Sequence, residues 1–323
     1  MILILSTSFD DDTNVVIEHL NNMGEQYVRL NDIDVFNGKT QVYYKVNYPD
    51  QLVIENEFIG KVNISEITTV WYRKWGNFDK YKEILEKDLS FEMLQYLYSE
   101  YFGVLNVILF SLRNKKWINH YTTINGLSKI EILVKAEMVG FKTPFTIITN
   151  KFEKENRSWI AKSVNDGKII NYKNKSFPVM TVEYNNPSVS TFPGLFQEQI
   201  IKEYELRIFH LNGKNYSMAI FSQNDFKTSL DFRNYNHEKP NRFIRYQMPK
   251  DLDRKVTKLM KALNLQTGSV DIIKGINGEY YFLEINPSGQ FRMTSYRCNY
   301  NLHYEMAILL KKLNHEEKSS SRN

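Results

Sequence analysis

The sequence predicts an α/β domain at the N-terminus followed by a region of α+β type. The first third of the chain alternates apolar runs of strand length with amphipathic segments of helical period. The remainder consists mostly of short runs rich in β-branched and aromatic residues, with few helical segments between them. With 323 residues, 42% of them hydrophobic and 24% charged, the chain is long enough for about two hydrophobic cores.

The N-terminal α/β domain, residues 1–124, opens as a β-α-β unit. The apolar run at 2–5 predicts a first strand, the amphipathic segment at 14–23 predicts a helix, and residues 27–30 return as a strand. The later predicted elements are a buried strand at 67–72, one long helix or two over 81–112, and a closing strand at 117–119.

A different pattern begins at residue 125 and predicts two α+β subdomains, at 125–194 and 195–313, before a frayed polar tail at 314–323. The helical segment at 127–139 ends at Gly140, and a strand follows at 145–148. Further strands are predicted at 158–164, 178–183, 195–201, 205–211, 214–221, 268–274 and 279–285, and helices at 252–263 and 302–313.

The composition narrows the class of protein. The 42 basic and 37 acidic residues give a net charge of +5 and form no clear basic stripe, which argues against nucleic-acid binding. The apolar stretch at 102–110 is far shorter than the roughly 20 residues that span a bilayer. The only cysteine, Cys298, excludes an intramolecular disulfide. We therefore expect a cytoplasmic protein with no nucleic-acid and no membrane partner.

Several familiar catalytic motifs are missing from the sequence. The nearest approach to a phosphate-binding P-loop is Gly38-Lys39-Thr40, where Ile33 stands at the required earlier glycine. There is no G-x-G-x-x-G, G-x-S-x-G or H-E-x-x-H motif, and the six histidines show no ligand spacing. These absences exclude a Walker-type site and argue against a protease, a zinc enzyme and a Rossmann dehydrogenase.

The most informative stretch is residues 271–289. A turn at Asn277-Gly278 would join two strands and place Asp271 opposite the end of the partner strand that carries Glu284 and Asn286. The latter two residues are two apart, so their side chains leave the same face of the strand. Three oxygen donors would then converge where Mg²⁺ could bridge nucleotide phosphates. Taken alone, the pattern also fits solvated carboxylates beside an ordinary hairpin.

In spacing and identity, Asp271, Glu284 and Asn286 resemble the metal-binding signature of the ATP-grasp ligases. The resemblance continues over the chain from about residue 125, and it implies ATP and Mg²⁺ as cofactors, gripped between two subdomains. It implies a lysine that reaches the nucleotide phosphates, a loop that covers them, a hinge strand that pairs with adenine and a glutamate at the ribose. The residues in these nucleotide-binding positions are Lys129, Lys162, Ser163, Asp166, Gly167, Glu198, Gln199, Ile200, Ile201 and Glu205.

The same resemblance implies catalytic cations. Arg207 stands where the family often uses a cation at the transferring phosphate. Many relatives also carry an arginine two positions before the metal aspartate, where this chain has Ser269. Arg245 or Arg292 could supply the missing charge, so the predicted catalytic set is Arg207, Arg245 and Arg292.

A narrower resemblance covers nearly the whole chain. Residues 71–75, Asp231-Phe232-Arg233 and the run at 289–300 resemble the graspetide maturases, which include the microviridin ligases and the grasp-with-spasm peptide maturases. These relatives imply a ribosomally made precursor peptide as partner, with a leader and an acidic, hydroxyl-containing core, and commonly a homodimer. Arg73 and Arg233 are then predicted to hold substrate carboxylates.

The expected function is ATP-dependent macrocyclisation of such a peptide. An Asp or Glu side chain would be activated as an acyl phosphate and joined to a Thr or Ser hydroxyl or a Lys amine. One alternative is an ATP-grasp ligase that adds a free amino acid to a protein or peptide carboxylate. Another is a protein that binds peptide in a nucleotide-dependent way without catalysis.

Overall fold

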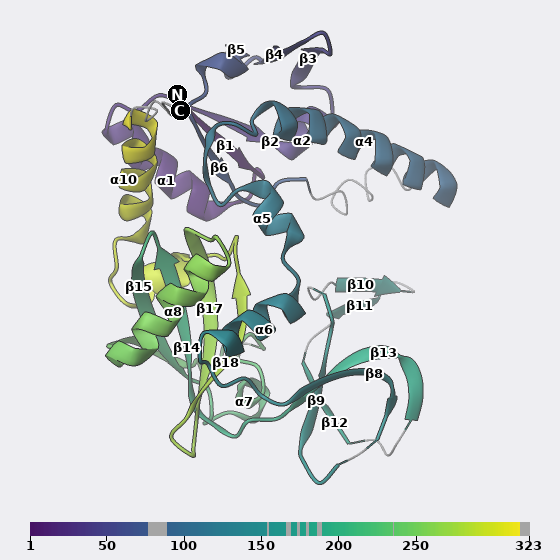
Figure 1. Ribbon diagram of the computed structural model, residues 1–323, viewed down its shortest axis with the longest axis vertical. Helices are drawn as coiled ribbons and strands as arrows, with labels where there is room; N and C mark the ends of the chain where they lie inside the picture. The colour runs from purple at the N-terminus through teal and green to yellow at the C-terminus, as the bar shows by residue number, and fades with distance from the viewer. Residues whose placement is uncertain are drawn as a thin grey trace. The chain divides into compact units, whose positions relative to one another are not determined.

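The computed structural model describes residues 1–76, 89–153, 155–165, 169–172, 175–178, 181–185, 189–234 and 236–316 (Figure 1). The chain divides into two compact units. The first contains Met1–Ile124 and the chain from Asn301 onward, and the second is Asn125–Tyr300. The division after residue 124 coincides with the predicted boundary. The predicted α/β and α+β fold class is confirmed.

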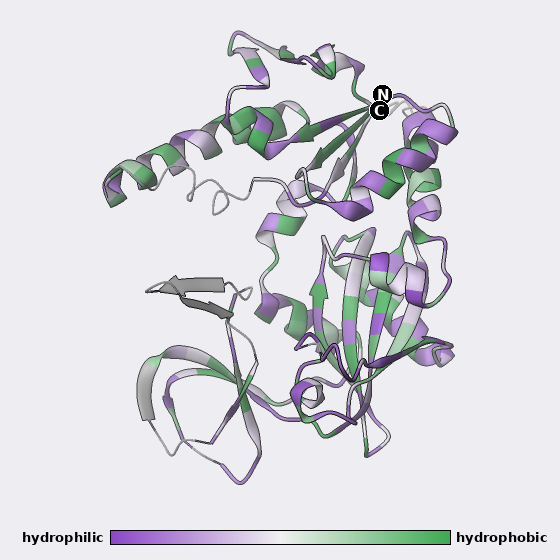
Figure 2. Cartoon of the chain, turned by 180° about the vertical axis from the view of Figure 1, so that it is seen from behind, coloured by the Kyte–Doolittle hydropathy of each residue, from purple (hydrophilic) through white to green (hydrophobic). Residues whose placement is uncertain are grey.

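The first unit is built around a parallel sheet with the strand order β2-β1-β6-β7. All five residues of its central strand β1 (Ile2–Ser6) are buried, as expected of a parallel strand covered on both faces. In Figure 2 the central strands of this sheet are green, the colour of hydrophobic residues. The surrounding elements are α1 (Asp11–Asn22), β2 (Tyr27–Asn31), β6 (Thr69–Tyr72), β7 (Lys116–Ile118) and α5 (Tyr121–Gly126).

A small antiparallel sheet in the first unit was not expected from the sequence. Its strands pair in the order β3-β4-β5 and bury Leu52, Ile54 and Val62 against the main core. Strand β3 has no fully buried residue, and only Val42 and Tyr44 on one of its faces pack, partly buried, against this core. The elements in this region are α2 (Asp32–Phe36), β3 (Gln41–Lys45), β4 (Tyr48–Asn56), β5 (Gly60–Asn63) and the 3₁₀ helix η1 (Ile64–Glu66).

The long predicted helix is present as α4 (Phe91–Ser111). The Ser90 side chain accepts a hydrogen bond from the Met93 amide at 3.3 Å and caps its start. The predicted start at residue 81 lies outside the described residues. The C-terminal half of α4 packs through Leu105, Ile108 and Leu109, whereas none of residues 91–100 is buried.

The last helix, α10 (Leu302–His315), belongs to the first unit. The sequence analysis predicted this helix but assigned it to the C-terminal subdomain, so that assignment was wrong for residues 301–313. The amphipathic pattern shows that a helix has an apolar face but not which core covers it. Here α10 packs on α1, and Glu25 pairs with Lys311 at 3.2 Å and with His315 at 2.9 Å.

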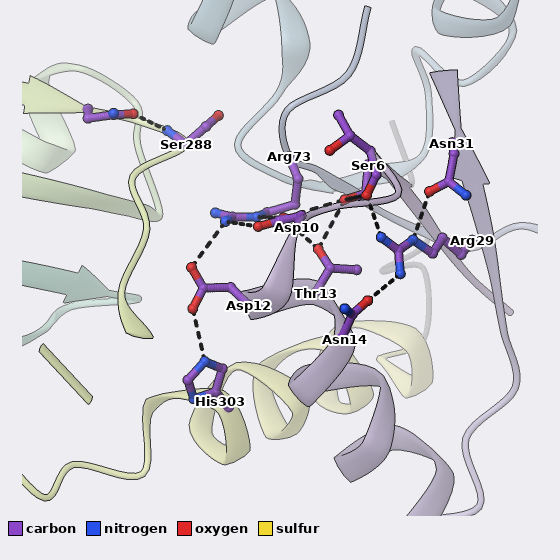
Figure 3. Close-up of polar contacts among 12 residues, drawn as sticks. Ser6, Asp10, Asp12, Thr13, Asn14, Arg29, Asn31, Arg73, Ser288 and His303 are labelled. Atoms are coloured by element: carbon purple, nitrogen blue, oxygen red, sulfur yellow. Dashed lines mark hydrogen bonds and ion pairs between the residues drawn. The ribbon is translucent and has the colours of Figure 1, made fainter. Parts of the chain in front are cut away.

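A buried polar network joins β1, α1 and α10 within the first unit (Figure 3). The Arg73 guanidinium lies 2.9 Å from the Asp10 carboxylate and 3.5 Å from that of Asp12. Thr13 donates to Asp10 at 2.7 Å, and His303 of α10 lies 2.9 Å from Asp12. Burial favours the neutral form of Asp10, but the charge and hydrogen bond of Arg73 and the Thr13 hydroxyl outweigh it and lower its pKa to about 2.

The second unit contains two larger antiparallel sheets, of which the first has the strand order β12-β9-β13-β8. Phe152, Trp159 and Phe196 form its small core. Its strands are β8 (Thr146–Phe152), β9 (Trp159–Lys162), β12 (Val182–Tyr184) and β13 (Val189–Glu198). A separate hairpin, β10 (Ile169–Tyr172) and β11 (Lys175–Pro178), was not predicted.

The second sheet of this unit has the order β16-β15-β14-β17-β18. Leu206, Ile272 and Phe282 on one of its faces pack against α6 and α8 in one core. Its elements are β14 (Lys202–Leu211), β15 (Lys214–Phe221), β16 (Arg242–Tyr246), β17 (Thr267–Gly275) and β18 (Tyr280–Asn286). The helices of this unit are α6 (Lys129–Met138), α7 (Phe226–Ser229), α8 (Lys250–Ala262) and α9 (Arg292–Arg297), of which α7 and α9, like β16, were not predicted.

None of the helices in the described ranges is long and apolar enough to cross a membrane.

The ion pair of Asp10 predicts an acid-sensitive contribution to stability. Because its pKa is about 2 in the folded chain and about 3.8 when unfolded, Asp10 stabilises the fold by roughly 2 kcal/mol above pH 5. That contribution is lost as the pH falls through the range between these values, and about half remains at pH 3. Urea unfolding of wild type and Asp10→Asn between pH 6 and pH 3 measures it. A stability difference that does not shrink on acidification contradicts the assignment.

Candidate active site

One row of side chains crosses all five strands of the second sheet. In the strand register, Arg245 pairs with Met218, Met218 with Arg207, Arg207 with Asp271, and Asp271 with Glu284. Residues directly opposite one another share a face of the sheet, so this row lies on one face. The neighbouring row, from Ile244 to Phe282, packs in the core on the other face. Alternation along the strands separates an apolar face from a charged one, and in β18 an irregularity in the register puts Phe282 and Glu284 on opposite faces.

The two carboxylates of this row are the candidate metal ligands. The Arg207 guanidinium donates to both oxygens of Asp271 at 3.2 Å, and Lys129 of α6 lies 3.9 Å from Glu284. Burial raises the pKa of Asp271, and the charge of Glu284 raises it further, whereas Arg207 opposes this. The register confirms that Asp271 lies opposite Glu284, with Asn286 two residues beyond on the same face.

The donor set suits a hard cation. Two carboxylates and the Asn286 amide are oxygen ligands, and Mg²⁺ commonly takes few protein ligands together with phosphate and water oxygens. Within the described part of the chain, no group of three or more His, Cys, Asp or Glu side chains is placed to hold a metal. A third protein ligand would therefore come from Asn286, whose side-chain oxygen also accepts from the Ser288 amide at 3.0 Å.

Two lysines, Lys162 of the first sheet and Lys129 of α6, lie in the electrostatic field of these carboxylates. Burial lowers the pKa of Lys162, the charge of Glu284 opposes this, and Lys129 adds to the lowering. Lys129 also donates to the Ser163 carbonyl at 3.4 Å, at the start of the predicted phosphate-covering loop. The structure thus brings Lys129, Lys162 and Glu284 together. The predicted loop residues Asp166 and Gly167 lie outside the described residues.

The predicted adenine-binding hinge runs from the first sheet to the second. The Glu198 amide donates to the Phe145 carbonyl, and the Gln199 amide donates to the Ser158 carbonyl, both at 2.8 Å. The segment then continues through Ile200, and the Ile201 carbonyl accepts from the Ile276 amide at 3.0 Å in the turn between β17 and β18. These bonds fix the backbone path of the hinge, and its contact with adenine stays a prediction.

The predicted ribose ligand, Glu205, is buried on the same face of β14 as Arg207. Its carboxylate accepts a hydrogen bond from Lys202 and another from the Ser222 hydroxyl at 3.3 Å. Burial raises the pKa of Glu205, and the Lys202 ammonium opposes this. Sequence reasoning missed Lys202 because residues three apart in a regular strand lie on opposite faces, whereas β14 is irregular between Lys202 and Tyr204.

Arg233, a predicted substrate ligand, belongs to the same electrostatic cluster. It donates to Asp231 from Nε at 2.8 Å and from a terminal nitrogen at 2.6 Å. This bond, followed by the charges of Asp231, Glu284 and Asp271, raises the pKa of Arg233 against the effect of burial. The sequence analysis named Asp231 only as part of a motif, whereas in the structure its carboxylate holds the Arg233 guanidinium in place.

The other predicted arginines lie in different surroundings. Arg245 stacks on the Tyr300 ring with its guanidinium carbon 4.6 Å from the centroid, and Arg292 lies 5.4 Å from that of Tyr296. Arg73, in the first unit, is buried in the ion pair with Asp10. The catalytic and substrate roles of these three arginines stay predictions.

Close packing explains the serine at position 269. Ser269 is 2% exposed, and a Cβ atom added to Gly289 would lie 2.4 Å from its hydroxyl oxygen and 2.6 Å from its Cβ. The chain after β18 therefore lies directly on Ser269, which leaves no space there for an arginine side chain. Gly289 is required because only a residue without a Cβ allows this approach.

The chain resembles known proteins in sequence and in fold. The family described as MvdD pre-ATP grasp domain matches residues 1–125. No protein of curated function matches the sequence. Solved structures of ATP-grasp and macrocyclase enzymes resemble nearly the whole chain, three of them as follows.

The first is a RiPP-associated ATP-grasp ligase of Chryseobacterium gregarium in complex with ADP and a leader and core peptide, with a TM-score of 0.81, 24% identity and 96% of each chain covered. The second is the macrocyclase MdnC of Microcystis aeruginosa MRC bound with precursor peptide MdnA, with a TM-score of 0.79, 23% identity and 97% of this chain and 99% of that chain covered. The third is the ATP-grasp ligase PsnB with minimal precursor, Mg and ADP, with a TM-score of 0.76, 16% identity and 97% of each chain covered. The chain therefore has the fold of the ATP-grasp ligases, as its metal-binding signature predicted, and residues 1–125 match the family model of the MvdD pre-ATP grasp domain.

Proposed function

We propose that the chain is an ADP-forming ligase that closes rings in a ribosomally made precursor peptide. The observation that supports this most strongly is the charged row Arg207–Asp271–Glu284, with Lys162 and Lys129 in its electrostatic field. Such a cluster suits the transfer of a phosphoryl group, whose charge develops on several oxygens at once. The solved structures of similar fold that contain ADP, Mg and precursor peptides support the choice of substrate.

The roles of the residues follow from their chemistry. Asp271, Glu284 and Asn286 would hold Mg²⁺, which supplies positive charge at the phosphates when bound. Lys162 and Lys129 would bind phosphate oxygens, Glu205 the ribose, and the hinge at 198–201 the adenine. Arg207 is positioned by Asp271 so that part of its fork can face the transferring group.

The proposed reaction has two steps. A carboxylate oxygen of the peptide forms a bond to the γ-phosphorus as the bond to the β-phosphate oxygen breaks, which releases ADP and leaves an acyl phosphate. A hydroxyl or amine of the same peptide then bonds to the acyl carbon, inorganic phosphate leaves, and the nucleophile's proton passes to the departing phosphate or to water. Holding both groups close can remove roughly 7 to 11 kcal/mol of the second barrier.

An exposed segment of α4 bears on the assembly state of the protein. The N-terminal half of α4 exposes Phe91 by 66% and Tyr96 by 59%, and an unburied helix segment of this composition suits contact with a second copy of the chain. We therefore propose a homodimer.

The buried free thiol of Cys298 is consistent with a reducing cytoplasm, which we propose as the location of the protein.

ADP release tests this function against its alternatives. Wild type is incubated with ATP, Mg²⁺ and a short peptide with acidic and hydroxyl residues encoded beside its gene. ADP that forms with the peptide alone supports the macrocyclase. ADP that forms only after a free amino acid is added supports the amino-acid ligase, and nucleotide binding without ADP release supports the non-catalytic protein.

The metal carboxylates should be essential for this reaction. Asp271→Ala and Glu284→Ala are expected to reduce ADP formation at least about a hundredfold because they remove oxygen donors for Mg²⁺. The matched control is Glu279→Ala, which removes an exposed carboxylate at the other end of the hairpin that pairs with Lys142 at 2.9 Å. The control should retain wild-type activity, and an active Glu284→Ala variant contradicts the metal assignment.

The close approach of Gly289 to Ser269 should also matter for activity. Gly289→Ala is expected to push the loop off the sheet and displace Asn286, lowering ADP formation roughly ten- to a hundredfold. Adding Ser269→Gly removes the two atoms that clash and should restore part of the activity. Full activity of the single variant, or no recovery in the double variant, contradicts this explanation.

A further inference from the structure

Three polar side chains, Thr146, Gln197 and Lys162, are linked by hydrogen bonds across the first sheet of the second unit. Thr146 on β8 lies directly opposite Gln197 on β13, and Gln197 lies opposite Ile160 on β9. Lys162 is two residues beyond Ile160, so all three polar side chains share one face of the sheet. The intervening positions Ile147, Ala161 and Phe196 belong to the other, apolar face.

The hydrogen bonds that link these three side chains all run in one direction. The Lys162 ammonium donates to the Gln197 side-chain oxygen at 2.9 Å, and the Gln197 side-chain nitrogen donates to the Thr146 hydroxyl at 2.9 Å. The Thr146 hydroxyl in turn donates to the Pro144 carbonyl at 2.8 Å. An ammonium can only donate and a carbonyl can only accept, so the amide has one orientation that satisfies both ends.

The choice of an amide has an electrostatic consequence. Gln197 is 2% exposed, so a polar group at this position must find partners within the protein. A carboxylate there would pair with Lys162 and cancel its charge, whereas the neutral amide holds the ammonium and leaves its full charge for an anion. The Gln197 amide therefore orients the Lys162 ammonium without neutralising its charge.

We propose that Gln197 is the positioning residue for the phosphate-binding cation: its carbonyl fixes the Lys162 ammonium, and Thr146 fixes the orientation of the amide. This inference deepens the proposed function and rests on it. Gln197 acts only through Lys162. Its replacement should change the binding of ligands that carry phosphate and leave the binding of adenosine unchanged.

Calorimetric titration of the full chain with Mg²⁺ and ADP, and separately with adenosine, measures both effects. Gln197→Glu, which keeps the shape and adds a charge, should weaken ADP binding roughly tenfold or more, with adenosine binding changed less than about twofold. Thr146→Val should weaken ADP binding by a smaller factor, about threefold, because the amide can then turn. The matched control is Thr149→Val on the same strand, whose hydroxyl donates to the Lys151 carbonyl.

A double variant separates positioning from a general structural role. Gln197→Leu should weaken ADP binding in the wild-type background and have no further effect in Lys162→Ala, because the two residues act as one unit. Equal losses of ADP and adenosine affinity, additive effects in the double variant, or unchanged ADP binding by Gln197→Glu would overturn the inference. Wild type that fails to bind ADP would overturn the proposed function and this inference together.

Discussion

Two carboxylates stand directly opposite each other on neighbouring strands, and the charged face of the second unit is arranged around them. Asp271 and Glu284 are register partners in β17 and β18, and like charges in that relation destabilise a sheet. Arg207 binds both oxygens of Asp271, and Lys129 approaches Glu284 to 3.9 Å, so each carboxylate has its own cation. A divalent cation between the carboxylates would relieve the same repulsion, which explains why this pair suits Mg²⁺.

The sheets keep this cluster apart from the hydrophobic core by simple alternation. Along β14, Leu206 and Ile208 point into the core while Glu205 and Arg207 point to the charged face. A shift of one residue in the register would bury the charges and expose the apolar side chains, so core packing fixes the site. The first sheet follows the same rule, because Phe196 lies in its core and Gln197 lies on its polar face.

Much of this arrangement was predictable from the sequence because alternation and turn residues are local. The hairpin at 271–286 follows from a turn at Gly278, but regular pairing from that turn would place Leu283 opposite Asp271. An irregularity in the register between Asp271 and Ile272 brings Glu284 opposite Asp271, and it has no signal in the sequence pattern. Contacts between distant segments have no such local signal. The pairing of Gln197 with Lys162, the return of α10 to the first unit and the packing of Gly289 on Ser269 appear only in the structure.

The mass of the peptide product tests the central claim most directly. A short peptide with acidic and hydroxyl residues, chosen as a candidate precursor, is incubated with wild type, Mg²⁺ and ATP, and its mass is compared with that after incubation with Glu284→Ala. The account predicts that only wild type removes one water per ring while ADP accumulates. A peptide that gains the mass of a free amino acid, or one that keeps its mass while ADP accumulates, would contradict ring closure by this site.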